Sequence, residues 1–208
     1  MEQMISTARR VPAMLILALF MLGNPAARAE SGSASDTAQR FQAELLDVMK
    51  IADTLDVGQR FKRLAPTVDR SFHLPLMTQI ATGQSWSRAT MDEREKLVQA
   101  FRRMSIATLA TLFSGYSGET FHVTDEKPGP SQTKLVLTHL LKTDGEKVQI
   151  AYIVRQFKVG WRMIDVIVDN GISELKVRRS EYNLVLKKGG VPALIALLNG
   201  KADELMSQ

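Results

Sequence analysis

The run Gly160-Trp161-Arg162-Met163-Ile164-Asp165-Val166-Ile167-Val168-Asp169 carries more information about the fold than any other part of the sequence. With the two-residue period of a β-strand, its apolar residues fall on both faces: Trp161, Met163 and Ile167 on one, and Ile164, Val166 and Val168 on the other. An antiparallel strand with one face in water would alternate apolar and polar side chains instead. We therefore expect cover on both faces, by a filled core or around an apolar cavity.

The segments before this run have the pattern of antiparallel hairpins. Apolar residues alternate with others from Lys134 to Leu141 and again from Val148 to Val154, and Thr143-Asp144-Gly145 between them is a typical hairpin turn. Lys158-Val159-Gly160 turns the chain into the last long strand. The sequence predicts an antiparallel sheet within residues 119–178.

The first half of the chain has the spacing of amphipathic helices instead. Apolar residues recur every three or four positions between residues 38 and 116, and Asp36 is a candidate N-cap for the first helix. Further helices are predicted over Val57 to Val68, over Leu74 to Thr82, and from a capping box at Thr90 to Gly115. C-terminal helices are expected over 179–205, the last starting at Val191 with Pro192 in its first turn. This order of elements predicts an α+β fold.

Residues 1–29 have the three parts of a cleavable signal peptide. Two basic residues, an apolar segment and small residues at the cleavage positions follow one another: Arg9 and Arg10, Val11 to Gly23, and Ala27-Arg28-Ala29. The apolar segment has 13 residues, fewer than the roughly 20 that span a bilayer. We predict cleavage before Glu30, a flexible start over 30–37, and a single domain over 38–208.

Composition excludes several kinds of chemistry. The chain has no Cys, and its histidines, His73, His122 and His139, are far apart in sequence without the spacing of metal ligands. No nucleophile elbow or phosphate-binding glycine loop occurs. The formal net charge of +5 is spread along the chain without a nucleic-acid-binding motif. We expect no catalytic residues, no cofactor, no metal and no nucleic acid. The basic pairs Arg178-Arg179 and Lys187-Lys188 have two interpretations: contact with lipid headgroups or a partner, or a solvated surface.

Several segments resemble the periplasmic phospholipid shuttles of the Mla (maintenance of lipid asymmetry) and toluene-tolerance systems, the MlaC family. The resemblance lies in Gly83-Gln84-Ser85-Trp86, Arg94, Phe101-Arg102, Tyr152, Gly160 to Ser173, and Arg179 with Tyr182. Leu97 and Leu109 stand where the family often has Phe and Tyr, and Asn170 is an additional residue. Phe113 to Phe121 is more similar to the hopanoid-associated branch, HpnM.

The resemblance implies an NTF2-like curved antiparallel sheet, packed against N-terminal and C-terminal helices and enclosing an apolar cavity. It implies a periplasmic carrier that shuttles phospholipid or a hopanoid between the inner and outer membranes. The implied partners are an inner-membrane transporter, either RND-type or an Mla-type ABC complex, and an outer-membrane complex. Apolar residues of the predicted strands and helices are the candidate lipid contacts: Leu76, Ile80, Met104, Leu109, Leu112, Phe113, Tyr152, Val154, Ile164, Val166, Val168, Ile172 and Leu175.

Two alternatives remain open at this stage. One is an enzyme on an NTF2-like sheet that uses Asp165 and Tyr152. Asp165 and Asp169 share a strand face, as paired catalytic carboxylates would. A structural role explains them as well: Asp165 would pair with Arg162, Arg155 or a neighbouring backbone group, and Asp169 would cap a turn. The other alternative is a periplasmic adaptor without cargo, whose interior would be filled.

Overall fold

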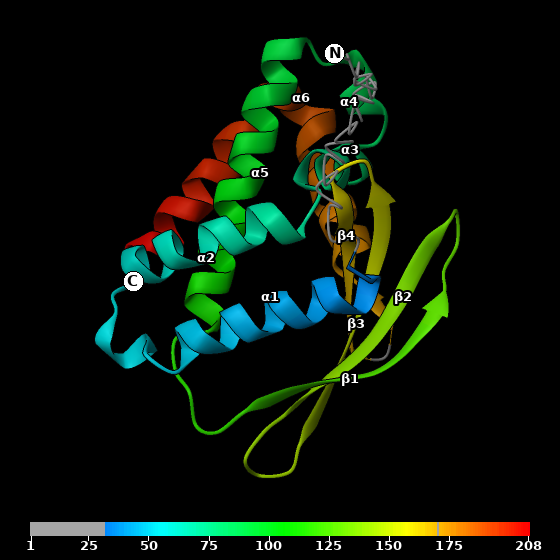
Figure 1. Ribbon diagram of the computed structural model, residues 1–208. Helices are drawn as coiled ribbons and strands as arrows, with labels where there is room; N and C mark the ends of the chain where they lie inside the picture. The colour runs from blue at the N-terminus through cyan, green and yellow to red at the C-terminus, as the bar shows by residue number, and fades with distance from the viewer. Residues whose placement is uncertain (1–31, 170) are drawn as a thin grey trace, which may run out of the picture. The chain divides into compact units, whose positions relative to one another are not determined.

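The computed structural model describes residues 32–169 and 171–208 (Figure 1). The predicted signal peptide, residues 1–29, and its cleavage site lie outside the described residues. Within the described ranges, no helix combines the length and the apolar character that crossing a membrane requires.

Five antiparallel strands form one sheet in chain order. They are β1 (Thr120–Pro128), β2 (Thr133–Leu141), β3 (Lys147–Phe157), β4 (Gly160–Val168) and the two-residue β5 (Ile172–Ser173). The turn between β2 and β3 is closed by Lys142, whose backbone N–H donates to Glu146 O at 2.9 Å. The structure confirms the predicted antiparallel meander, and Figure 1 shows its strong curvature.

A β-bulge in β4 changes which residues share a face. Tyr152 pairs with Val166 and Ile153 with Asp165, but Val154 then pairs with Met163, so one extra residue, Ile164, lies between the paired positions. The extra residue shifts the alternation by one position. Met163 therefore faces the same side as Val166, and the predicted grouping of Met163 with Ile167 is wrong. A plain two-residue period cannot locate such an insertion.

Helices precede and follow the sheet. They are α1 (Ala34–Met49), the 3-10 helix η1 (Ala52–Thr54), α2 (Val57–Ser71), α3 (Leu74–Thr82), α4 (Gln84–Arg88), α5 (Met91–Leu112) and α6 (Glu174–Met206). Helix α1 crosses one face of the sheet and contacts β1 to β4, while α5 packs along α6 (Figure 1). We call the side that carries α1 the helix-facing side of the sheet and the opposite side the outer face.

The first helix begins inside the segment predicted to be a flexible start. Ser33, not Asp36, is the N-cap: its hydroxyl accepts from the Asp36 N–H at 3.0 Å, and the Asp36 carboxylate accepts from the Ser33 N–H at 2.6 Å. This reciprocal pair is a capping box with Asp at its third position. Ala34 and Thr37 are buried, which fixes the start of the helix against the rest of the domain.

The predicted last helix from Val191 is formed after a kink in α6, but the C-terminal helical region starts earlier than predicted. It begins at Glu174, before the predicted residue 179, because the Ser173 hydroxyl accepts from the Lys176 N–H at 3.1 Å and caps it. Leu175 is therefore helical, and the sheet ends at Ser173 rather than at residue 178. The helix is kinked at Gly190, whose φ of 67° and ψ of −164° are not helical. Pro192 lies just beyond the kink, in the first turn of the second segment.

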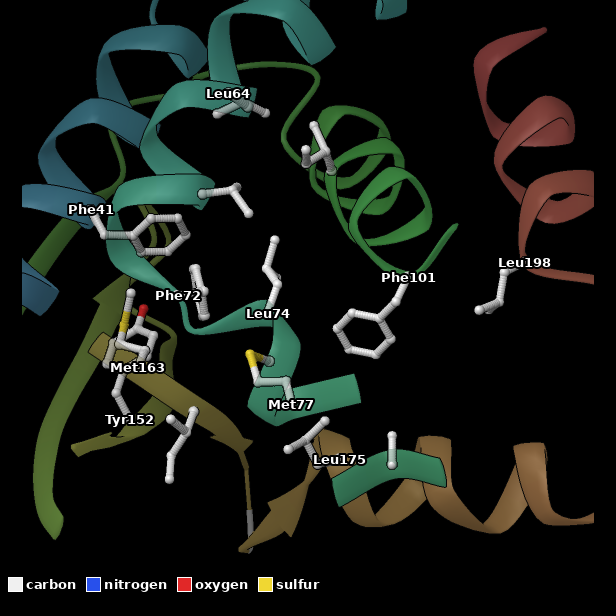
Figure 2. Packing of buried hydrophobic residues seen from close by; sticks show 14 of the residues in the cluster. Phe41, Leu64, Phe72, Leu74, Met77, Phe101, Tyr152, Met163, Leu175 and Leu198 are labelled. Atoms are coloured by element: carbon white, nitrogen blue, oxygen red, sulfur yellow. The ribbon is translucent and has the colours of Figure 1, made fainter. Parts of the chain in front are cut away.

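The core lies between the helix-facing side of the sheet and the helices, and continues between α2, α5 and α6, where Leu64, Phe101 and Leu198 are buried (Figure 2). Phe41 of α1 packs edge-on against Phe72, with ring centroids 5.0 Å apart, and against Tyr152, with centroids 6.3 Å apart. Helix α3 continues the layer, with Leu74 and Met77 buried beside these rings. Residues far apart in sequence thus form one apolar layer over β3 and β4.

Candidate functional site

The helix-facing side of β2, β3 and β4 is almost entirely apolar. Val136, Val154 and Met163 are fully buried there. A small polar network lies among them: the Gln42 side-chain amide donates to the Thr138 hydroxyl at 3.0 Å and to the Tyr152 hydroxyl at 3.3 Å. Burial raises the pKa of Tyr152 to about 12, so its phenol is neutral at physiological pH. The buried centre of this side of the sheet is therefore uncharged and mainly aliphatic and aromatic, and the charged Lys134 lies near its edge, paired with Glu126.

Ten of the thirteen candidate lipid contacts belong to the hydrophobic core or pack against it, but those from α5 face other helices and not the sheet. Four of these are buried in it, namely Tyr152, Val154, Ile164 and Leu175. Six are half-buried and pack against it, namely Leu76, Ile80, Met104, Leu109, Phe113 and Val166. The fold thus brings together side chains from α3, α5, β3, β4 and α6 that are separated in the sequence.

The other three candidates lie elsewhere. Leu112 is 69% exposed at the end of α5, and Ile172 is 54% exposed in β5. Val168 lines a pocket that also reaches the outer face of the sheet. These positions are apolar by type, and the strand or helix period alone does not reveal that their surroundings are open.

A pocket of about 530 Å³ is floored by the outer face of β2, β3 and β4. Its floor is apolar, with Leu135, Leu137, Ala151 and Ile167, and its polar lining includes His139, Lys147, Gln149 and Asp169. The volume falls within the range of about 300–1,000 Å³ that small-molecule sites occupy. This hollow was not predicted, because the bulge at Ile164 is what places Ile167 on this face.

A second hollow, of about 390 Å³, lies at the seam between α1 and β1. Ala43 and Leu46 line it from the helix, and Phe121 and Val123 line it from the strand. Gln42 also borders this hollow and is hydrogen-bonded to Tyr152, so the seam lies directly beside the core layer. It is a route by which an apolar chain could enter between helix and sheet.

Asp165 has a structural environment. Its side chain is 8% exposed and accepts three hydrogen bonds: from the Val166 N–H at 2.8 Å, the Ser173 hydroxyl at 2.6 Å and the Leu175 N–H at 3.2 Å. It thereby joins β4 to the start of α6. Asp169 is exposed and accepts from the Gln149 N–H at 3.3 Å. Asp165 is thus held by neighbouring backbone groups, which is one of its predicted structural roles, whereas the Asp169 carboxylate contacts strand β3 instead of capping a turn as predicted.

Two of the three histidines, which are far apart in the sequence, lie close together in the structure. His122 and His139 stack on the paired strands β1 and β2, with ring centroids 5.0 Å apart. Desolvation, together with His122 and Lys147, lowers the pKa of His139. Across residues 32–169 and 171–208, no group of three or more His, Asp or Glu side chains is arranged to hold a metal ion.

Comparison with known proteins gives two findings. The family model described as "MlaC protein" matches residues 39–200. Among solved structures, the phospholipid-binding protein from Ralstonia solanacearum, determined in complex with a phospholipid, is similar with a TM-score of 0.75 and 21% sequence identity. The match covers 84% of this chain and 99% of that one, so the two proteins share the fold over almost the whole relative. No curated protein matches the sequence.

Proposed function

Because this chain belongs to the MlaC protein family, we propose that it is a lipid carrier that binds the acyl chains of a phospholipid and moves the lipid through the periplasm between the two membranes. The observation that carries the proposal is the structural match to a protein solved with a phospholipid, which extends over 99% of that protein. The signal peptide proposed for residues 1–29 would deliver the chain to the periplasm.

The acyl chains would lie on the helix-facing side of the sheet, against candidate residues of β3 and β4 such as Tyr152, Val154 and Val166. Each methylene removed from water contributes about 0.8 kcal/mol, so affinity can come from apolar area without charged contacts. The side chains between sheet and helices fill this layer, and the guest would enter as the helices move away from β3 and β4. The hollow at the seam between α1 and β1 supports entry from that side.

Two observations favour different lipids as the cargo. The structural relative favours a glycerophospholipid. The segment from Phe113 to Phe121, which is similar to the hopanoid-associated branch, favours a hopanoid as the second candidate. In either case the partner that receives or delivers the lipid would be an inner-membrane transporter, of the RND type for a hopanoid and an Mla-type ABC complex for a phospholipid, working with an outer-membrane complex.

Lipid analysis of the protein purified from a Gram-negative periplasm tests the proposal. Native mass spectrometry should find one lipid per chain, and solvent extraction followed by mass spectrometry should identify it as a phospholipid or a hopanoid. The purified protein should also move a fluorescent phospholipid between donor and acceptor vesicles. A protein that carries no lipid and transfers none would contradict the proposal and favour an adaptor without cargo.

A further inference from the structure

The first segment of α6, from Glu174 to the kink at Gly190, has an exposed side that its packing does not explain. This segment runs past β4 and α3 (Figure 1), and Leu175 and Tyr182 point into the core. Val177 and Leu184, seven residues apart and so on one side of the helix, are 40% and 59% exposed. Single apolar side chains on a surface need no explanation, but exposed apolar side chains grouped on one side of a helix and rimmed by polar residues mark an interaction surface.

Basic side chains surround the two apolar ones. The segment carries Lys176, Arg178, Arg179, Lys187 and Lys188 against Glu174 and Glu181, a net charge of +3, whereas the whole chain of 208 residues has +5. Arg178 turns inward, donating to the Ser105 hydroxyl at 2.9 Å and covering the Phe101 ring. The other four basic residues are exposed, with Glu181 as the exposed acid on the same segment.

These charges have no carboxylate partners among the described residues. Eight ion pairs join basic and acidic side chains elsewhere in residues 32–169 and 171–208, and none includes a residue of this segment. Lys176, Lys187 and Lys188 lie around the two exposed apolar side chains, with Glu181 as the one acid on the same side of this segment. A mainly basic rim around exposed apolar side chains is the pattern of a helix face that meets anionic lipid.

We propose that this side of α6, defined by Lys176, Val177, Leu184, Lys187 and Lys188, docks on the surface of an anionic phospholipid bilayer. The lysines would contact lipid phosphates while Val177 and Leu184 enter the boundary between headgroups and acyl chains. The helix starts beside the pocket of the outer face, whose lining ends at Gly171, and beside the exposed Ile172. Docking thus brings the sheet near the membrane. Docking by this surface does not depend on the proposed carrier function.

Vesicle co-sedimentation tests the proposal. The purified protein should bind vesicles of phosphatidylcholine with phosphatidylglycerol, bind pure phosphatidylcholine much more weakly, and lose affinity as salt is raised. The triple variant Lys176→Gln/Lys187→Gln/Lys188→Gln should bind the anionic vesicles about a hundredfold more weakly, because each basic residue near such a surface contributes about fivefold. Leu184→Ser, which keeps every charge, should weaken binding about tenfold.

A charge-matched control separates a specific face from net charge. Lys62, Lys158 and Lys201 are exposed and without ion pairs in the described part of the chain, and Lys62→Gln/Lys158→Gln/Lys201→Gln removes the same charge. It should weaken binding less than threefold. Equal losses of affinity in the two triple variants would overturn the proposal, and so would the absence of binding to anionic vesicles. The absence of binding would favour a protein partner for this face instead. Lipid carried by the purified protein is measured separately, so the two proposals can fail independently.

Discussion

Tyr152 and Asp165 lie on neighbouring, paired strands, and their side chains point to opposite faces of the sheet. Tyr152 pairs with Val166, and the next pair joins Ile153 to Asp165. The phenol meets Gln42 of α1 on the helix-facing side, whereas the carboxylate meets Ser173 and the start of α6 on the other. A single substrate cannot contact both groups. An enzyme that uses these two residues together is therefore incompatible with the register of β3 and β4.

Asp165→Asn should destabilise the fold without abolishing lipid binding by the folded protein. Both backbone N–H groups donate to Oδ1, which an amide keeps, but the Ser173 hydroxyl donates to Oδ2, which an amide replaces with an NH2 donor in an almost buried position. Leaving buried donors without acceptors costs about 1–3 kcal/mol. Urea unfolding should give a loss of this size, and Asp169→Asn, an exposed neighbour on the same strand end, should change stability by less than about 0.5 kcal/mol. Equal effects at both positions would contradict this account.

Tyr152 should make the fold sensitive to alkaline pH. Burial raises the pKa of this phenol from 10.0 to about 12, so folding favours the neutral form. Below pH 10 the stabilisation is fully present; between pH 10 and about 12 the unfolded chain ionises first and stability falls, by about 2–3 kcal/mol in total.

The corresponding variant is Tyr152→Phe, compared with Tyr116→Phe at an exposed position. Tyr152→Phe lacks the hydrogen bond to Gln42, so at pH 7 its free energy of unfolding should be about 0.5–1.5 kcal/mol lower than that of the parent protein. Above about pH 10 the urea midpoint of this variant should fall less steeply than that of the parent. Tyr116→Phe should follow the parent protein at every pH. If the parent and Tyr152→Phe fall in parallel above pH 10, Tyr152 is not the group responsible.

Local signals in the sequence were sufficient for much of the fold. The capping box at Thr90 and Glu93 is formed and starts α5, and α3 ends at Gly83 as predicted. The bulge at Ile164 was not predictable, because the strand is apolar on both faces and gives no sign of a change in register. The start of α6 was missed although Ser173 is a common type of N-cap residue, because its contact with Asp165, eight residues earlier, is not visible in the sequence.

Gly190 and Gly200, both within α6, should respond in opposite directions to the same substitution. Gly190 has φ 67° and ψ −164°, a region essentially restricted to glycine, so Gly190→Ala should cost about 1–3 kcal/mol. A Cβ there would meet Pro192 Cδ at an ordinary 3.7 Å, so the backbone, not space, opposes the change. Gly200 is helical with nothing within 4 Å of an added Cβ, and Gly200→Ala should gain about 0.5–1 kcal/mol. Thermal unfolding of both variants checks the kink; a stabilised Gly190→Ala would refute it.

The candidate site was predictable in composition but not in location. Apolar strand and helix positions identified Tyr152, Val154 and Leu175, which the fold gathers into one layer. Sequence patterns do not tell a filled layer from a hollow one, since both require the same side chains. Nor do they reveal the outer pocket, which depends on the curvature of the sheet and on the bulge. The two faces of β4 are consequently rival positions for an acyl chain.

Val166 and Ile167 offer a matched test of these two faces. They are consecutive, half-buried, β-branched residues of β4; Val166 packs against the core layer, whereas Ile167 lines the pocket of the outer face. Glutamine at either position keeps a side chain of similar length but introduces an amide that an acyl chain cannot satisfy. We expect Val166→Gln to lower the amount of co-purified lipid per folded chain several-fold and Ile167→Gln to leave it within about 20% of the parent. Native mass spectrometry of both variants gives the answer, with circular dichroism to confirm folding. The reverse result would move the lipid to the outer pocket, and loss in neither variant would place it away from β4, because a chain in contact with this strand must touch one side or the other.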